Sequence, residues 1–450
     1  MTDVRVELLA QGEHPVDPQA ETVEWPAAAG TTPTMRSGLD WSVSQFGATL
    51  PQARDLLRVA AAAYLADRRA RQPVRRLRRD LTLTVHVETV DAWDETTREH
   101  MVDLLHWLTG DDWALRCVPH TPTGPATATT ALGLTTADDV SLLSGGLDSL
   151  CGALVRLRQP GSVFFLGHAD STAAVRHAQE HLQAHLDGGR PPAPYRQYAL
   201  RRPPRSNEHH RGPRTRSLLF MSMAVAAATG MGAGRVLVPE NGFTSINPPL
   251  EPSRGGPLTT RSTHPWTFHA LGLLLGRLGL GHVQVTNPHA ALTKGELLAL
   301  AMPDRTAADQ ELAATTVSCA KLNAGRPKGG DAHTQCGLCI ACLVRRGAFA
   351  GARLPDRTRH LTATLPPASR TVLLHHRRSL PGACLPLGAL IGQTRRAGTP
   401  TGRQPAGFLP ASRQASPAVA LNRYARTLGP GRRAASVIAQ GAGPRGINNL

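Results

Sequence analysis

The sequence predicts an α/β fold whose core is a doubly wound, five-stranded parallel sheet, and three observations lead to this prediction. Short β-prone runs alternate with segments of helical apolar spacing from residue 138 onward, which is typical of a parallel sheet covered by helices. A glycine-rich loop directly follows the first of these runs, as ligand loops do at the carboxyl edge of such sheets. The chain has 450 residues, 41% of them hydrophobic, which is enough for at least one large core.

An N-terminal α+β domain is expected over residues 1–120. Residues 1 to about 50 show little periodicity. The elements expected after them are a helix from Pro51, a strand over Leu81–Val87, a helix over Glu95–Thr109 and a strand over Trp113–Val118. Threonine, proline, glycine and alanine dominate the stretch that follows, so we place a linker at residues 121–137.

The main domain is expected over residues 138–355. Its predicted strands are Val140–Leu143, Ser162–Leu166, Tyr195–Leu200, Arg235–Pro239 and His282–Thr286. Its predicted helices lie between them, at about Ser149–Arg158, Thr172–Leu186, Thr215–Thr229 and Pro265–Leu278. Strands that alternate with helices in this way run parallel, and a ligand site is expected at their carboxyl ends.

The residues after the main domain differ from it in composition. The stretch 361–450 contains 12 arginines but no lysine, aspartate or glutamate, and its apolar spacing is irregular. We expect it to be a largely disordered tail, with a functional basic arm as the alternative. Without this tail the formal charge of +17 falls to +5, which is ordinary for an enzyme. The charge is therefore no evidence for a nucleic-acid partner.

Signals for membrane insertion and secretion are absent from the sequence. No run reaches the roughly 18 to 20 uncharged apolar residues of a membrane span, and the N-terminus lacks the basic start and apolar stretch of a secretory signal. We therefore expect a soluble, cytoplasmic protein with no membrane partner. In a reducing cytoplasm its seven cysteines are expected to be thiols or metal ligands rather than disulfides.

The first motif that carries chemistry is Ser144-Gly145-Gly146-Leu147-Asp148-Ser149, between the first predicted strand of the main domain and its helix. Glycines let backbone amides approach phosphate oxygens, and a helix N-terminus adds unpaired N–H groups. Asp148 would act through Mg²⁺ or by holding the loop. No Gly-Lys-Ser/Thr ending follows, which disfavours γ-phosphate transfer. We predict that these six residues bind ATP, and a tight turn with a helix cap is the alternative.

The second motif is a cluster of four cysteines, Cys319, Cys336, Cys339 and Cys342. Their spacing supplies the four ligands that zinc prefers and leaves no open position for catalysis. We predict a structural Zn²⁺ site in a zinc knuckle over residues 319–345, which would pin the C-terminal segment to the sheet. An iron–sulfur cluster and a redox C-x2-C pair are the alternatives.

The order of these motifs resembles that of a known family. The phosphate loop, the segment Thr293-Lys294-Gly295-Glu296 and the cysteine cluster with Arg345 resemble the 7-cyano-7-deazaguanine synthases, the QueC family of PP-loop ATP pyrophosphatases. The resemblance covers roughly residues 139 to 350 and implies a HUP-like fold. It implies that the loop binds the ATP phosphates, that Lys294 lies near the leaving pyrophosphate and that the four cysteines bind Zn²⁺. A surface lysine at a helix start is the alternative for Lys294.

The chemistry that this resemblance implies is carboxylate activation. ATP would adenylate the carboxyl group of a deazaguanine-type substrate, pyrophosphate would leave, and an amine would attack the acyl adenylate. In the family that amine is ammonia, and a second ATP dehydrates the amide to a nitrile. Mg²⁺, Asp148 and Lys294 would stabilise the leaving group, so Asp148 and Lys294 are the catalytic candidates.

Three features depart from the biosynthetic enzymes of that family. Gly167-His168-Ala169-Asp170 follows the second strand, a segment over 240–249 follows the fourth, and the N-terminal unit is additional. Together they resemble QatC, the QueC-like component of the Qat anti-phage defence system, which implies other Qat proteins as partners. His168 is a candidate contact for the substrate or for adenine, and a generic loop histidine is the alternative.

Two other functions stay open on the sequence. A PP-loop enzyme that modifies tRNA would need a free catalytic thiol pair and a basic RNA-binding face, which the cysteine spacing and the +5 charge disfavour. A catalytically inactive, nucleotide-binding scaffold in a defence complex would bind ATP without releasing pyrophosphate.

Overall fold

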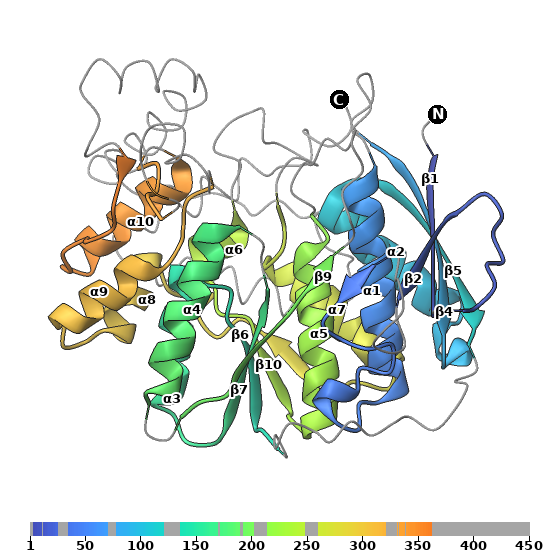
Figure 1. Cartoon of the computed structure of the whole chain (residues 1–450), viewed down its shortest axis with the longest axis horizontal. Helices are drawn as coiled ribbons and strands as arrows, with labels where there is room; N and C mark the ends of the chain where they lie inside the picture. The colour runs from blue at the N-terminus through green and yellow to red at the C-terminus, as the bar shows by residue number, and fades with distance from the viewer. Residues whose placement is uncertain are drawn as a thin grey trace, which may run out of the picture.

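The structure is a computed structural model that describes residues 3–10, 12–25, 35–70, 78–120, 136–169, 172–189, 192–201, 214–247, 260–320, 331, 333–337 and 339–361. These residues form two parallel sheets with helices packed between them (Figure 1). Most of the expected linker and the expected disordered tail lie outside the described residues, so both stay predictions. None of the described helices combines the length with the apolar composition that crossing a bilayer requires.

The central sheet has the predicted architecture. Its strands are β6 (Asp139–Leu142), β7 (Val163–His168), β8 (Tyr195–Tyr198), β10 (Arg235–Leu237) and β11 (Gln284–Thr286). They follow the order β11-β10-β6-β7-β8, and all neighbours pair in parallel, which confirms the five-stranded parallel sheet. The chain extends the sheet first from one side of β6 and then from the other. The topological switch point, where doubly wound sheets bind ligands, therefore lies between β6 and β10.

Helices cover both faces of the central sheet (Figure 1). On one face lie α3 (Leu147–Leu157) and α4 (Ala173–Asp187), and on the other α5 (Arg216–Met231) and α7 (Pro265–Arg277). Eleven of the 16 residues of α5 are buried, because this helix packs on the sheet on one side and on another helix on the other. Such burial explains why α5 is apolar around nearly its whole circumference.

Shorter helices form an outer layer beyond α3 and α4 (Figure 1). They are α8 (Lys294–Ala301), α9 (Ala307–Thr315) and α10 (Ile340–Gly351), while α6 (Gly242–Ile246) follows β10. α8 packs against both α3 and α10. A side chain at Gly295 would lie 3.3 Å from the backbone oxygen of Ala348, so the glycine allows α8 and α10 to approach closely.

The N-terminal unit differs from our expectations in its first 50 residues and in its fold class. Residues 1–50 show little periodicity, yet they contain β1 (Asp3–Ala10), β2 (Glu21–Trp25), β3 (Arg36–Ser37) and the short 3-10 helix η1 (Ser44–Phe46). β1 pairs in parallel with β2 and with β4 (Asp80–Val87), and β4 pairs in parallel with β5 (Asp112–Pro119). The unit is thus a four-stranded parallel α/β layer in the order β2-β1-β4-β5, and not the α+β domain that we expected.

Side chains on β1 explain why the sequence pattern did not predict this strand. Val6 and Leu8 are buried in the main hydrophobic core, whereas Arg5 and Glu7 alternate with them on the opposite face. Glu7 is fully buried all the same, because the backbone N–H groups of Val16 and Asp17 donate to its carboxylate. This face of β1 therefore carries charged residues that break the apolar run typical of a buried parallel strand.

The two sheets share one continuous core. α1 (Pro51–Arg69) packs on β1 and β4 with one side and on α5 with the other, and α2 (Glu95–Thr109) packs on β5 and α7. A short helix, η2 (Val90–Trp93), precedes α2, and β9 (Leu200–Arg201) pairs with β3 in antiparallel fashion. Buried residues from both sheets belong to a single hydrophobic cluster. The helix layer therefore fixes the N-terminal sheet to the central one.

Candidate functional site

The predicted phosphate loop lies at the carboxyl end of β6, where α3 begins. Gly145 has a φ of 91°, and a side chain there would lie 3.3 Å from Gln179 of α4. Gly146 precedes α3 as its N-cap, and no described side chain caps this helix. The hydroxyls of Ser144 and Ser149 lie 3.2 Å apart. The first-turn amides of α3 and these hydroxyls together form an arrangement suited to an anion.

Leu147 contributes to the loop through its backbone, because its side chain is 1% exposed and belongs to the core beneath the loop. The loop is held from the other side by the segment that leads to the cysteines. The backbone N–H of Val317 donates to the carbonyl of Gly145 over 3.0 Å. The phosphate loop and the cysteine segment are therefore physically linked.

Arg345 of α10 anchors that linking segment. It is fully buried, and its guanidinium donates to the hydroxyl of Thr316 over 2.8 Å and to the backbone oxygen of Ala313 over 2.6 Å. Its Nε donates to the hydroxyl of Thr358 over 2.9 Å. Burial lowers the pKa of Arg345 to about 10, which leaves the side chain charged at neutral pH. Arg345 therefore stabilises the residues behind the loop and does not face the site.

Asp148 and Lys294 meet at the switch point. Lys294 is the first residue of α8, and its ammonium group contacts Asp148 Oδ2. Both side chains are 11% exposed. Burial opposes both charges, but each partner compensates the other, so the pKa of Asp148 is below and that of Lys294 above its ordinary value. The surface lysine that we considered as an alternative is thus wrong, since Lys294 is inside the site.

Two residues of the segment 240–249, to which the sequence analysis assigned no role in the site, complete this group. Glu240 and Asn241 directly follow the segment after β10, and the amide of Asn241 donates to Asp148 Oδ2 over 3.2 Å and to Glu240 Oε1 over 3.3 Å. Asn241 is fully buried and also caps α6 through Thr244. Burial and the charge of Asp148 raise the pKa of Glu240 well above its usual range. An amide that bridges two carboxyl groups holds them together without adding charge.

A small cavity opens on the opposite side of the phosphate loop, between β6, β7 and α5. The ring of His168, at the end of β7, stacks on Phe220 with 5.1 Å between centroids, and the guanidinium of Arg216 lies over the same ring. The predicted contact His168 therefore lines the cavity next to Ser144. The lining is mostly apolar, and it comprises Leu142, Leu143, Ser144, Leu166, Gly167, His168, Arg216, Phe220 and Met223.

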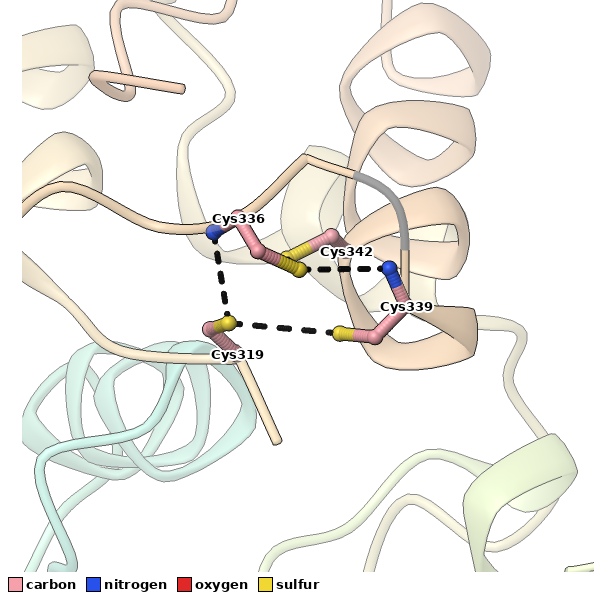
Figure 2. Close-up of side chains that lie close together, drawn as sticks. All are labelled: Cys319, Cys336, Cys339 and Cys342. Carbon is pink, nitrogen blue, oxygen red and sulfur yellow. Dashed lines mark hydrogen bonds between the residues drawn. The ribbon is translucent and has the colours of Figure 1, made fainter. Parts of the chain in front are cut away.

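The four predicted metal ligands lie together (Figure 2). All four Sγ atoms are within 4.8 Å of one another, with 3.9 Å between the sulfurs of Cys336 and Cys342 and 4.0 Å between those of Cys339 and Cys319. Zinc–sulfur bonds of about 2.3 Å in a tetrahedron place sulfurs about 3.8 Å apart, so the cluster is consistent with zinc. Backbone N–H groups of Cys336 and Cys339 point to sulfurs of Cys319 and Cys336 over 3.3 Å each. Such donors favour thiolates over thiols.

The residues present also fit the groups that a nucleotide site requires. The Oδ1 atom of Asp148 is buried, and no described donor reaches it, so this oxygen suits a cation or a shared proton. A Cβ at Gly145 would lie 3.4 Å from Ala178, so the glycine lets the loop pack closely on α4, which fixes the position of the loop amides. Asp148 would hold Mg²⁺, and the loop amides and Lys294 would hold phosphate oxygens, which supplies electrostatic stabilisation of a pyrophosphate leaving group.

Comparison with known proteins shows a distant, partial similarity. Over 147 residues, 32% of this chain, the sequence is 26% identical to a 7-cyano-7-deazaguanine synthase of Ralstonia nicotianae. The chain covers 56% of that synthase, so it spans about half the length of the curated relative that it matches. No family model matches the chain.

Proposed function

We propose that this protein uses ATP to adenylate a carboxylate, releases pyrophosphate and transfers the acyl group to an amine. The observation that carries the proposal is that three features lie together at the switch point. These are the uncapped glycine loop that precedes α3, the Asp148–Lys294 pair and the carboxyl group of Glu240. Positive charge beside a glycine loop supports departure of pyrophosphate, because that leaving group carries concentrated negative charge.

The arrangement around the loop supports a division of the site into two halves. The apolar cavity with His168 and Phe220 lies on the β7 side and suits a purine ring, which binds by stacking and apolar contact. Polar groups gather on the β10 side, where Asn241 and Glu240 lie. We assign the β7 side to the adenine of ATP and the β10 side to the carboxylate substrate.

A deazaguanine-type acid is the substrate that we propose, and it rests on the partial similarity to a 7-cyano-7-deazaguanine synthase. The acceptor that we propose is ammonia or another small amine. A role in anti-phage defence, alongside other Qat proteins, is a further proposal that rests on the resemblance of the additional N-terminal unit and of the segment 240–249.

The test is release of pyrophosphate from MgATP by the purified chain with 7-carboxy-7-deazaguanine. Asp148→Asn should lower the release at least about 100-fold, because the amide neither pairs with Lys294 nor binds Mg²⁺ strongly. Asp187→Asn, which alters an exposed aspartate at the end of α4, is the matched control and should match the parent. Equal turnover by the parent and Asp148→Asn would show that the site has been assigned to the wrong groups.

The same measurements separate the two competing functions. A nucleotide-binding scaffold would bind ATP by calorimetry but release no pyrophosphate with any acid. A tRNA-modifying enzyme would need free thiols near the loop, whereas Cys319, Cys336, Cys339 and Cys342 lie within one cluster. Cys151 lies closer to the loop, but burial raises its pKa far above the ordinary thiol value, which makes it a poor nucleophile.

A further inference from the structure

Three histidine side chains lie together between α4 and the segment that leads to the cysteine cluster, and the proposed function uses none of them. His177 and His181 lie on α4, and the ring of His333 packs on that of His177 with 3.7 Å between ring centroids. Residues four positions apart occupy the same face of a helix. Imidazole is a common ligand of transition metals, so these rings are a candidate metal site.

The Nε2 atoms of His177 and His181 point at each other. They lie 3.0 Å apart, with 4.2 Å between the ring centroids. Zinc–imidazole bonds are about 2.0 to 2.1 Å long, so two nitrogens that bind one ion at adjacent positions lie about 2.9 to 3.4 Å apart. A hydrogen bond between two such nitrogens requires that one of them carries no proton. The pair therefore has the separation, and at least one of the free electron pairs, that chelation of an ion needs.

His333 packs on the ring of His177 from a segment that is itself held in place. The backbone N–H of His333 donates to Asp331 Oδ1 over 3.0 Å, and the hydroxyl of Thr334 donates to the same oxygen over 2.9 Å. A ring on an anchored segment restricts the rotation of the ring that packs on it. Contact with His333 therefore helps to orient His177 toward His181.

The acidic side chains nearest the pair have other partners. Asp331 Oδ2 forms an ion pair with Arg359, and Glu180 of α4 lies 3.7 Å from Arg176. The ligands that remain are neutral nitrogens, which suit zinc, nickel and copper, whereas Mg²⁺ and Ca²⁺ prefer oxygen. The chemistry of the pair thus selects the class of metal.

The histidine pair also differs from the cysteine cluster in the number of ligands that it supplies. Among the described residues, no third histidine, cysteine or acidic ligand atom lies within 4.8 Å of both Nε2 atoms. Water would complete the coordination of an ion bound there. An ion with open positions exchanges more readily than one enclosed by four thiolates, so the pair suits reversible binding.

We propose that His177 and His181 chelate a divalent transition-metal ion of the zinc and nickel class, and that His333 is the positioning residue that orients His177. The ion binds the Nε2 atom of each ring, and each ring keeps its proton on Nδ1. Any proton on the two Nε2 atoms passes to water when the ion binds.

This site is distinct from the site of the proposed function. Ala178 and Gln179 are the residues of α4 that a side chain at Gly145 would meet, so they face the phosphate loop. The metal site requires neither ATP nor a carboxylate substrate. Its occupancy can therefore be measured without any assay of activity.

The experiment titrates Ni²⁺ into the full chain by calorimetry in the absence of nucleotide. The chain is first saturated with Zn²⁺ and then desalted in the presence of a weak chelator, so that the cysteine cluster is supplied with metal beforehand. His177→Ala and His181→Ala should each lower the affinity of the site for Ni²⁺ at least about 100-fold, because the loss of a ligand exceeds the loss of a residue that only orients one.

His185→Ala is the matched control, since His185 is an exposed histidine one turn further along α4. This variant should keep the parental affinity. His333→Ala should weaken binding about 10- to 100-fold, the usual effect of residues that orient a ligand, and His333→Phe should restore most of the loss because it keeps a ring against His177.

A second measurement reads the site in the parent without any substitution. Ni²⁺ should protect His177 and His181 from modification by diethylpyrocarbonate, which attacks unprotonated imidazole nitrogens, and should leave His185 reactive. Mass spectrometry of the peptides of α4 reports each histidine separately.

Equal Ni²⁺ binding by the parent, His177→Ala and His181→Ala would overturn the site, because other histidines of the chain would then account for the binding. An equal loss in His185→Ala would overturn the pairing of His177 with His181. A loss in His333→Phe as large as in His333→Ala would overturn the positioning role of the ring. None of these results depends on release of pyrophosphate, so failure of this site and failure of the proposed function are distinguishable.

Discussion

The carboxyl edges of the two parallel sheets differ in how their polar groups are satisfied. At the central sheet, the buried Asp148 Oδ1 has no donor among the described residues, and the glycine loop next to it is uncapped. At the N-terminal sheet, polar side chains satisfy one another. His86 contacts Glu7 over 2.9 Å and Glu13 over 3.3 Å, and Glu13 also contacts His120.

The charged groups near the N-terminal edge are paired as well. The buried Arg58 lies 2.9 Å from Asp55 and 2.7 Å from Glu88, although its Nε donor has no described acceptor, and Asp55 accepts the backbone N–H groups of Glu88 and Thr89. Both sheets share the parallel topology whose carboxyl edge commonly binds ligands. The comparison shows that topology supplies the edge, whereas a buried carboxylate oxygen without a donor, next to an uncapped glycine loop, makes the central edge a candidate site.

The largest expected effect is on the cysteine cluster that supports the central edge. Cys339→Ser should lower the free energy of unfolding by about 4 kcal/mol or more, since loss of a structural metal is among the most destabilising single changes. Because the cluster braces the phosphate loop through Val317, ATP affinity should fall as well. Urea unfolding with elemental analysis measures the effect. Cys117→Ser, at a cysteine of β5 outside the cluster, is the control, and one zinc per chain in Cys339→Ser would contradict the assignment.

The next effect concerns the helix layer between the sheets. His264 caps α7 and packs on Trp107 of α2, and burial lowers its pKa from 6.5 to about 4. The unfolded chain therefore binds the proton first, so stability present above pH 6.5 is lost as pH falls toward 4, by roughly 3 kcal/mol. His264→Asn keeps a capping side chain but does not titrate, so its stability should depend less on pH in this window. Parallel stability curves for the two proteins, from urea titrations, would contradict this account.

A third prediction separates the packing of the phosphate loop at Gly145 from backbone strain alone. Gly145→Ala and Gly232→Ala both introduce a side chain at a positive φ, and each should cost about 1 kcal/mol of stability. Gly145→Ala should in addition weaken ATP binding about 10- to 100-fold, the value of one hydrogen bond to a charged group, because its Cβ would press on Gln179 and Ala178 of α4 and displace the loop amides. Gly232, at the end of α5, has nothing within 4 Å of an added Cβ. Calorimetric titration with ATP should separate the variants, and equal affinities would exclude the loop from nucleotide binding.

The smallest expected effect concerns the N-terminal edge. Glu7 is fully buried, and its carboxylate accepts the backbone N–H groups of Val16 and Asp17 over 2.9 Å and 3.0 Å. Glu7→Gln turns an acceptor into a donor there and should cost about 1 to 2 kcal/mol of stability. Pyrophosphate release per folded molecule should stay at the parental value, measured below the melting transition. A parallel fall in activity would show that the two edges are coupled.

Local motifs in the sequence predicted the parts of the site whose geometry depends on neighbouring residues. The glycine loop needs a strand, two glycines and a helix start in direct succession, and three of the four cysteines lie within seven consecutive residues. The central sheet was predicted correctly because its short β-prone runs alternate with helices of clear apolar spacing, although β6 and β8 also carry polar residues. β1 was missed because the charged Arg5 and Glu7 alternate with its buried apolar residues, and the backbone N–H groups that satisfy Glu7 come from a later loop.

The tertiary structure decided which distant residues meet. Asp148 reaches Lys294 across 146 positions of the chain and Asn241 across 93, and nothing in their local sequence predicts either contact. These contacts depend on the strand order, which places β10 beside β6, and on the packing of α8 against α3. The spacing of residues along the chain is enough to predict a glycine loop or a metal knuckle, because the few covalent bonds between neighbouring residues fix the geometry of each. The charge balance of Asp148, Glu240 and Lys294 depends on burial and proximity, which arise when the separate strands assemble into one sheet.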